Sequence, residues 1–294
     1  MADSCAGRIA LVTGASRGIG KGTAIRLAAE GADVAVLARA TEAVHLGWSM
    51  GQTVTEIERL GRRAMALEVD LGDPSVDRYR VIDQVEAELG PLDILVNNAA
   101  AGGYRYFADW DDAELRRMQE VNVWAPWQLT RRALEGMRER GRGWVVNVSS
   151  AAAELPVGPP FSASMVARRG AAYGSTKAML NRFTASLAVE LYGSGIAVNA
   201  VSPQAATATE GVLASIETGR IKAEQTEPLE TMVEAILALC TADPDSLTGQ
   251  IAYSLELLRT LGRVSYDLYG MAPVEGWGPE DLTARIKAQE AARR

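Results

Sequence analysis

Short apolar runs alternate with longer segments of helical periodicity along most of the chain. The first run, RIALVTG at residues 8–14, is typical of a β-strand, and residues 19–31 then carry apolar side chains at helical spacing up to a glycine. Further strand-like runs follow in the order DVAVLAR, AMALEVDL, LDILVNNA, GWVVNVSS, IAVNAVSP and GQIAYSL. Because these runs are apolar throughout, they favour a parallel sheet that is covered on both faces. The alternation therefore predicts an α/β fold, a single Rossmann-type doubly wound parallel sheet with helices on both faces.

The same pattern indicates one long domain followed by a tail. Residues 1–262 are predicted to form a single domain, and residues 263–294 a C-terminal extension that ends in a polar helix. Helices within the domain are expected at residues 53–61, 75–90, 113–140 and 173–192. Three segments have no regular pattern, namely residues 40–52, 151–170 and 204–227.

The composition excludes several classes of function. A net charge of −7 argues against a nucleic-acid surface. The presence of only one histidine, His45, argues against a His/Cys metal site and against a triad with a histidine base. Cys5, in a terminus expected to be mobile, and Cys240 are predicted to be free thiols. No apolar segment has the ~18 residues of a membrane span, and MADSCAGR does not resemble a signal peptide, so a cytoplasmic protein without a membrane partner is expected.

A glycine-rich turn, TGASRGIG, joins the first predicted strand to the first predicted helix. Gly14, Gly18 and Gly20 allow the backbone to turn tightly and to bring its amide groups to a pyrophosphate. The positive end of the helix adds to the attraction for an anion. The turn therefore predicts a dinucleotide site, although a glycine-rich turn can also be purely structural.

The charges near this turn indicate which dinucleotide is bound. A site for NAD has a carboxylate at the end of the second strand, where it meets the ribose 2′-hydroxyl. Here Ala38 and Arg39 occupy that position, and Arg17 lies inside the glycine turn. Two guanidinium groups fit a 2′-phosphate, so NADP(H) is predicted ahead of NAD(H), unless both arginines are simply solvated. Asp70, after the third strand, is expected to meet the edge of the adenine ring.

The sequence YGSTK places a phenol and an amine one helical turn apart. Tyr173 and Lys177 are four residues apart, so they share one face of a helix. A nearby ammonium favours the phenolate and would lower the pKa of the tyrosine toward neutrality. Such a tyrosine can donate a proton to a carbonyl or remove one from an alcohol. The small residues between the two are expected to leave room for a cofactor ribose and a substrate.

Five motifs occur in a fixed order along the chain. They are the glycine turn, NNAA at residues 97–100, VNV around Asn122, NVSS ending at Ser150, and YGSTK. In this order, over about residues 8–255, the chain resembles the short-chain dehydrogenase/reductase family, in its branch of shorter NADP-type enzymes.

The resemblance implies a role for each catalytic motif. Tyr173 would be the acid/base, Lys177 would lower its pKa and hold the nicotinamide ribose, and Ser150 would hydrogen-bond the substrate oxygen. Asn122 would anchor a water in a proton relay behind Lys177. Ser150 is preferred to Ser149 because neighbours in a strand face opposite ways. No metal ligand is implied.

The resemblance also implies a set of cofactor contacts. Asn97 would steady the sheet beside the cofactor, and Thr209 or Thr207 would touch the nicotinamide carboxamide. The full predicted cofactor set is Gly14, Ser16, Arg17, Gly18, Ile19, Gly20, Arg39, Asp70, Leu71, Asn98, Ala99, Tyr173, Lys177, Pro203 and Thr209. Residues 1–262 would be the dinucleotide-binding catalytic domain, with residues 204–227 as its substrate loop. Helices 113–140 and 173–192 would pair with other subunits in a homotetramer or dimer.

Several positions depart from the family pattern. Residues 151–172 make a longer connection from Ser150 to Tyr173 than usual, and they are expected to form either an ordered lid or pocket wall, or a neutral surface insertion. Gln204 and Ala100 stand where the family has glycine. The long connection after the second strand is weakly similar to the hydroxysteroid-dehydrogenase-like subgroup, which hints at a lipid-like substrate.

Three functions remain open at this stage. The first is an oxidoreductase that transfers a hydride between NADP(H) and a carbonyl or secondary alcohol. The second is a non-catalytic NADP-binding sensor or scaffold, against which the presence of Ser150 argues. The third is another reaction on the same fold, such as dehydration or epimerisation, whose usual glycine spacing is missing here.

Overall fold

The computed structural model describes residues 3–39, 49–218 and 221–293. His45 and most of the segment at residues 40–52 lie outside the described residues. Within the described ranges, the chain forms a seven-stranded parallel sheet in the order β3-β2-β1-β4-β5-β6-β9. Its strands are β1 (Ile9–Thr13), β2 (Asp33–Ala38), β3 (Ala64–Glu68), β4 (Leu92–Asn97), β5 (Gly143–Val148), β6 (Ile196–Ser202) and β9 (Ile251–Tyr253). The predicted doubly wound sheet is confirmed.

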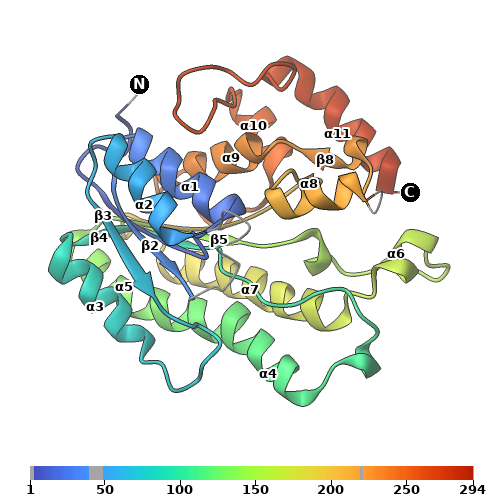
Figure 1. Ribbon diagram of the computed structural model, residues 1–294, viewed down its shortest axis with the longest axis horizontal. Coiled ribbons are helices and arrows are strands. Elements are labelled where there is room, and N and C mark those ends of the chain that lie inside the picture. Colours follow the sequence, from blue (N-terminus) through green and yellow to red (C-terminus); the bar gives the residue numbers. More distant parts are fainter. Residues whose placement is uncertain (1–2, 40–48, 219–220, 294) are drawn as a thin grey trace.

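Helices cover both faces of the sheet (Figure 1). One face carries α1 (Gly18–Ala29), α2 (Met50–Arg59), α9 (Leu229–Thr241) and α10 (Ser254–Leu261). The other carries α3 (Arg78–Glu88), α5 (Ala125–Arg140) and α7 (Ala171–Glu190). Each layer encloses its own apolar core, because residues of a parallel strand point alternately to the two sides. The two edge strands are less buried than the others, as Ala66 and Glu68 of β3 and Ile251 of β9 are exposed.

The helix predicted over residues 113–140 contains a change of winding. It consists of α4 (Asp112–Gln119), a π-helical turn η3 (Glu120–Trp124) and α5. Pro126, in the first turn of α5, has no N–H to give to the carbonyl of Asn122, so the regular hydrogen-bond pattern fails at this point. The turn places Asn122, a predicted site residue, at the irregularity.

The insertion between β5 and α7 is only partly helical. It contains a 3₁₀ turn η4 (Ala151–Ala153), a short helix α6 (Ala163–Arg168) and extended chain between them. Leu155, Val157 and Phe161 are 85%, 80% and 53% exposed. These side chains point to solvent, so they do not form the predicted wall of a pocket in this conformation.

Residues 204–227, which the sequence predicts as a substrate loop, form a small substructure of their own. Two-residue strands β7 (Ala206–Thr207) and β8 (Thr226–Glu227) pair in parallel at its base. Between them lie α8 (Glu210–Glu217) and a 3₁₀ turn η5 (Ala223–Gln225).

A further 3₁₀ turn, η2 (Phe107–Asp109), precedes α4.

The C-terminal extension packs against the face that carries α1 and α9. It contains an isolated β-bridge between Tyr266 and Pro273 and ends in α11 (Pro279–Arg293). Leu282 and Ile286 of α11 join the apolar core of that face. The extension therefore buries apolar side chains against the main domain.

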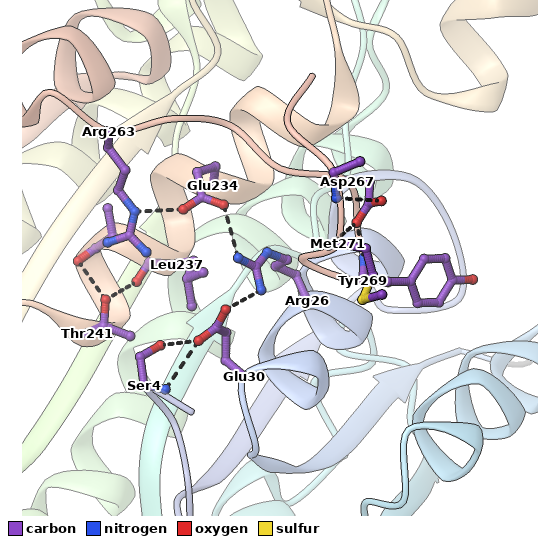
Figure 2. Close-up of polar contacts among 12 residues, drawn as sticks. Ser4, Arg26, Glu30, Glu234, Leu237, Thr241, Arg263, Asp267, Tyr269 and Met271 are labelled. Atoms are coloured by element: carbon purple, nitrogen blue, oxygen red, sulfur yellow. Dashed lines mark hydrogen bonds and ion pairs between the residues drawn. The ribbon is translucent and has the colours of Figure 1, made fainter. Parts of the chain in front are cut away.

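A buried ionic network ties this region together (Figure 2). The guanidinium of Arg26 on α1 lies 2.5 Å from Glu30 and 3.4 Å from Glu234 on α9. Glu234 also accepts a hydrogen bond from Nε of Arg263, at 2.6 Å, at the start of the extension. Ser4 donates its hydroxyl and its backbone N–H to Glu30. The two buried carboxylates thus join the N-terminal segment, both helices and the extension.

The two cysteines are free, as predicted, but Cys5 is not in a mobile terminus. Its side chain is fully buried, and its backbone N–H donates to the carbonyl of Glu30. Burial raises the pKa of both thiols, that of Cys5 to about 11. Among the described residues, no helix is long and apolar enough to cross a membrane, and no group of three or more His, Cys, Asp or Glu side chains could hold a metal ion.

Candidate active site

A cavity of about 730 Å³ opens at the carboxyl ends of β1, β2, β3 and β4. This is where an open α/β sheet binds its ligands, since the strand order reverses here. Most of the predicted cofactor residues line it: Gly14, Ser16, Arg17, Gly18, Ile19, Arg39, Asp70, Leu71, Asn98, Ala99 and Thr209. Four predicted cofactor residues are not among its lining residues, namely Gly20, Tyr173, Lys177 and Pro203. The alternative Thr207 is buried and does not line the cavity either.

The glycine turn has a shape that side chains would block. Gly14 and Gly18 have φ angles of +67° and +53°, which favour glycine. A Cβ on Gly20 would lie 2.3 Å from the carbonyl oxygen of Gly14 and 2.5 Å from Nδ2 of Asn98. Asn98 in turn donates to the carbonyl oxygen of Thr13 at 2.8 Å. Gly20 therefore allows the tight turn, as predicted, while its predicted contact with the cofactor stays a prediction.

The start of α1 binds an anion in this structure. The carboxylate of Glu210 accepts a hydrogen bond from the backbone N–H of Gly18 at 3.2 Å. This N–H belongs to the first turn of α1, where helical backbone groups lack partners and the helix dipole is positive. The turn thus fits the pyrophosphate of a dinucleotide, because it already accepts a carboxylate there.

Two arginines, Arg39 and Arg117, and one aspartate, Asp70, line the part of the cavity at the ends of β2 and β3. Arg39 follows the buried end of β2, where Ala38 leaves no carboxylate for a ribose hydroxyl. Asp70 accepts two hydrogen bonds from Arg117, at 2.8 and 3.0 Å, and one from the backbone N–H of Gly72. Burial opposes ionisation of Asp70, but these hydrogen bonds and the charges of Arg117 and Arg39 hold its pKa below the usual value. Its carboxylate already has a cationic partner, so its predicted contact with adenine stays a prediction.

Tyr173 and Ser150 lie together, from different elements. The Ser150 side chain, just beyond the end of β5, lies within hydrogen-bonding reach of the phenol of Tyr173 in the first turn of α7. Ser150 also accepts from the backbone N–H of Ala152 at 3.2 Å. The ring of Tyr104 packs edge-on against Tyr173, with centroids 5.9 Å apart. Ser149 is buried on the other side, and its hydroxyl has no partner among the described residues.

The pKa of Tyr173 differs from the sequence expectation. Burial raises it to about 12, the neighbouring Tyr104 adds to the rise, and the hydrogen bond with Ser150 opposes it. Lys177 contributes nothing to this shift, although its amine lies 5.9 Å from the centre of the tyrosine ring. The expected lowering toward neutrality is therefore wrong for the chain in this state, because the loss of solvent is the largest cause of the shift and Lys177 does not offset it.

Lys177 is the largest fully buried side chain of the protein's described part. Its amine donates to the backbone carbonyl of Val148, at the end of β5, at 2.8 Å. Burial lowers its pKa from 10.5 to about 8. The burial of the pair therefore favours the phenol of Tyr173 and the uncharged amine of Lys177 together.

Asn122 uses its side chain to hold the site together. Its amide donates to the carbonyl oxygen of Ala101 at 2.8 Å and to the hydroxyl of Thr176 at 3.0 Å. Its side-chain oxygen accepts from the N–H of Ala101 at 2.8 Å. Both side-chain N–H groups of Asn122 already have acceptors. The predicted water would therefore have to bind a backbone group of the π-helical turn or the second lone pair of the side-chain oxygen.

The small residues of YGSTK do not all serve an open face. A Cβ on Gly174 would lie 2.3 Å from the carbonyl oxygen of Ala152, so this glycine lets η4 approach α7. Thr176 is buried against Asn122, and only Ser175 is exposed. The expectation that all three leave room for ligands is wrong, because two of them pack against the protein.

Asn97 is buried at the end of β4 and does not line the cavity. It donates to the side-chain oxygen of Asn147 at 2.9 Å, and Asn147 donates to Thr184 on α7 at 2.9 Å. This buried chain of polar groups joins β4, β5 and α7, so the sheet-steadying part of its predicted role agrees with the structure.

Four residues at or near the cavity were not singled out from the sequence. Thr13 accepts the backbone N–H groups of Asn98 and Ala99, both at 3.0 Å. Glu210 and Arg117 have the contacts described above, and the fully buried Glu227 accepts the N–H groups of residues 204 and 205. Thr13 could have been found from its place just before the glycine turn. The other three act across long sequence separations and leave no local signal.

The sequence profile of the short chain dehydrogenase family matches residues 8–217. The chain belongs to this family. A short chain dehydrogenase of Pseudocercospora fijiensis is 38% identical over 199 residues, which cover 67% of this chain and 59% of that protein. The chain thus spans less than two thirds of that relative's length, whereas it covers 94% of an uncharacterised oxidoreductase of Thermotoga maritima.

Other relatives bear on the expected subgroup and cofactor. The 7alpha-hydroxysteroid dehydrogenase of Escherichia coli is 31% identical over 253 residues, covering 83% of this chain and 91% of that enzyme. The predicted similarity to that subgroup is therefore confirmed. A short chain dehydrogenase of Burkholderia cenocepacia, solved in complex with NADP, is 31% identical with a TM-score of 0.71, covering 85% of this chain and 97% of its own. This dehydrogenase shares both the family and the fold with the chain.

Proposed function

We propose that this protein is an NADP(H)-dependent oxidoreductase that interconverts a carbonyl compound and a secondary alcohol, with Tyr173 as the acid/base. The observation that carries the proposal is the contact between the Ser150 hydroxyl and the Tyr173 phenol, with Lys177 one helical turn away. Two hydroxyl groups at one point can both hydrogen-bond one substrate oxygen. A protein that only bound the dinucleotide would have no use for this pair.

The protonation states suit the direction of reduction. A phenol with a pKa of about 12 is protonated at neutral pH, so it can give its proton to the oxygen of a carbonyl as negative charge develops there. Ser150 would hold the same oxygen by a second hydrogen bond. The bound cofactor would supply the hydride. The ammonium group of Lys177, with a pKa of about 8, is the nearby acid that could return a proton to the Tyr173 oxygen.

The choice of NADP(H) rests on charge. Arg17 and Arg39 line the cavity, and β2 ends without a carboxylate that would repel a 2′-phosphate. The relatives include proteins described with either cofactor. The Burkholderia cenocepacia structure contains NADP, and a relative from Mycobacterium tuberculosis, 34% identical over 204 residues, is called NAD-dependent. The local charges favour the first of these two.

Exposed apolar side chains on α7, just after it and on the π-helical turn that precedes α5 support an oligomer. Trp124, Met179, Val189 and Tyr192 are exposed large hydrophobic residues. Trp124 packs edge-on against Trp127, whose ring contacts Phe183 of α7. These two helices would pair with those of a second copy to form the homotetramer or dimer that the family resemblance implies.

The loss of NADPH absorbance with a panel of ketones, including steroid ketones, and quinones tests the proposed reaction. Tyr173→Phe should lower turnover by about 10²–10⁴-fold, because it removes the acid, while NADPH still binds. Tyr106→Phe, which removes an equivalent hydroxyl from an exposed tyrosine, is the matched control and should keep full turnover. Turnover that survives Tyr173→Phe would contradict the assigned acid. NADPH binding without turnover across the panel would favour the sensor or scaffold.

A further inference from the structure

The carboxylate of Glu210 occupies the anion-binding point of the cofactor cavity. It accepts the backbone N–H of Gly18 at 3.2 Å, and it lines the same cavity as Gly14, Arg17 and Arg39. Glu210 is the first residue of α8, in the substrate loop, 192 positions away in the sequence. The contact therefore joins the loop to the start of α1 directly across the cavity.

This contact conflicts with a bound dinucleotide. The N–H groups at the start of α1 are the donors that a pyrophosphate uses in this fold. A carboxylate and a pyrophosphate are both anions, so they compete for the same donor and repel each other at short range. A Cβ on Gly18 would lie only 3.2 Å from the Thr209 side chain, which shows how closely the loop approaches the turn.

The structure gives α8 freedom to move away. None of the eight described residues of α8 is buried, so its displacement would expose little apolar surface. A second cavity, of about 700 Å³, lies on its other side, between Leu213 of α8, the start of α9 and Trp277 of the extension. Thr209 and Glu210 line both cavities, and α8 lies on the side of the molecule that carries α9 and α11 (Figure 1).

The base of the loop is anchored, in contrast to α8. Glu227 is fully buried, and its carboxylate accepts from the N–H of Gln204 at 3.0 Å and from the hydroxyl of Ser254 at 2.9 Å. Its Oε2 also accepts the N–H of Ala205 at 3.3 Å. A movement of the loop would therefore pivot at β7 and β8, while α8 and its first residue swing.

We propose that Glu210 is a competing anion that closes the cofactor cavity, and that α8 must leave the start of α1 before the dinucleotide binds. This inference rests on the proposed NADP(H) function. Without ligand, Glu210 satisfies the N–H of Gly18 and holds the loop over the cavity. With ligand, the pyrophosphate replaces the carboxylate, and α8 is released toward the second cavity. The apparent affinity for the cofactor equals the intrinsic affinity multiplied by the fraction of molecules in the open state.

Titration of NADPH fluorescence measures this competition directly. Glu210→Gln keeps the size of the side chain but removes its charge, and Kd for NADPH should fall about tenfold as the open fraction approaches one. Glu224→Gln is the matched control, because Glu224 belongs to the same loop and lines the second cavity without contact to α1. This control should leave Kd unchanged.

A fragment of the cofactor separates local competition from a general effect of charge. Adenosine 2′-monophosphate carries the 2′-phosphate but no pyrophosphate, so its Kd should be equal for the parent protein and Glu210→Gln. Stopped-flow binding adds a kinetic test. The observed rate should reach a plateau with NADPH concentration in the parent protein, set by the movement of α8, and should rise linearly in the variant.

The outcomes separate this inference from the proposed function. Tighter NADPH binding by Glu210→Gln, and by Glu210→Ala as a second variant, supports the competing anion. Equal or weaker NADPH binding by both variants overturns it and leaves the oxidoreductase intact. A failure of the parent protein and of both variants to bind NADPH would overturn the proposed function as well.

Discussion

The buried ammonium of Lys177 makes a measurable contribution to stability that depends on pH. Lys177 is 2% exposed. Its amine donates a hydrogen bond to the carbonyl of Val148 at 2.8 Å, and no second acceptor is found among the described residues. Burial lowers its pKa from 10.5 to about 8. Lys177→Met removes the titrating group but keeps a long apolar side chain in the same space.

The sign follows from proton binding in the two states. The folded protein releases the Lys177 proton near pH 8, whereas the unfolded chain keeps it up to about 10.5. Between these values the unfolded state binds more protons, so stability rises with pH. The cost of the buried charge is fully present below pH 8, and it is relieved as the pH rises toward 10.5. From about pH 7 to about pH 9.5 the parent protein should gain about 2 kcal/mol relative to Lys177→Met.

Guanidinium unfolding of both proteins at the two pH values tests this reasoning. The difference in unfolding free energy should shift toward the parent protein by about 2 kcal/mol at the higher pH. Lys287→Met, which removes an exposed amine on α11, is the control and should show a constant difference. Tyr173 is common to all three proteins, so its titration cancels. A difference for Lys177→Met that does not change with pH would refute the assigned burial of the charge.

Two further predictions concern charged side chains, namely Arg39 at the end of β2 and Glu234 in the buried ionic network. Arg39→Asp should shift the ratio of NADH to NADPH affinity toward NADH by about tenfold or more, because it replaces a partner of the 2′-phosphate by a repelling carboxylate; equal affinities of the parent protein for both cofactors, in a fluorescence titration, would contradict the assignment. Glu234→Ala leaves the buried Arg26 with Glu30 alone, so it should cost about 3–5 kcal/mol in guanidinium unfolding, whereas the exposed Glu290→Ala should cost less than about 0.5 kcal/mol; a cost below about 1 kcal/mol for Glu234→Ala would argue against the network of Figure 2.

The local geometry of the site could be read from the sequence. Apolar runs, glycine spacing and the four-residue separation of Tyr173 and Lys177 each depend on neighbouring residues, since backbone sterics and helical pitch act over one or two turns. The order of the motifs was enough for the resemblance that placed Ser150 beside Tyr173. The structure has these elements in those places, with the glycine turn between β1 and α1.

The tertiary structure decided which charged and polar groups have partners. Asp70 faces Arg117 across 47 positions, and Glu210 reaches Gly18 across 192 positions, so no local pattern announces either contact. Burial likewise reversed the expected pKa shift of Tyr173, because desolvation depends on everything packed around a group and not on its neighbour in the helix. The sequence by itself determined the fold, the glycine turn and the placement of Tyr173 and Lys177 on one helix. Only the folded chain determined their electrostatics and the contact of Glu210 with Gly18, since those depend on distances between segments far apart in the sequence.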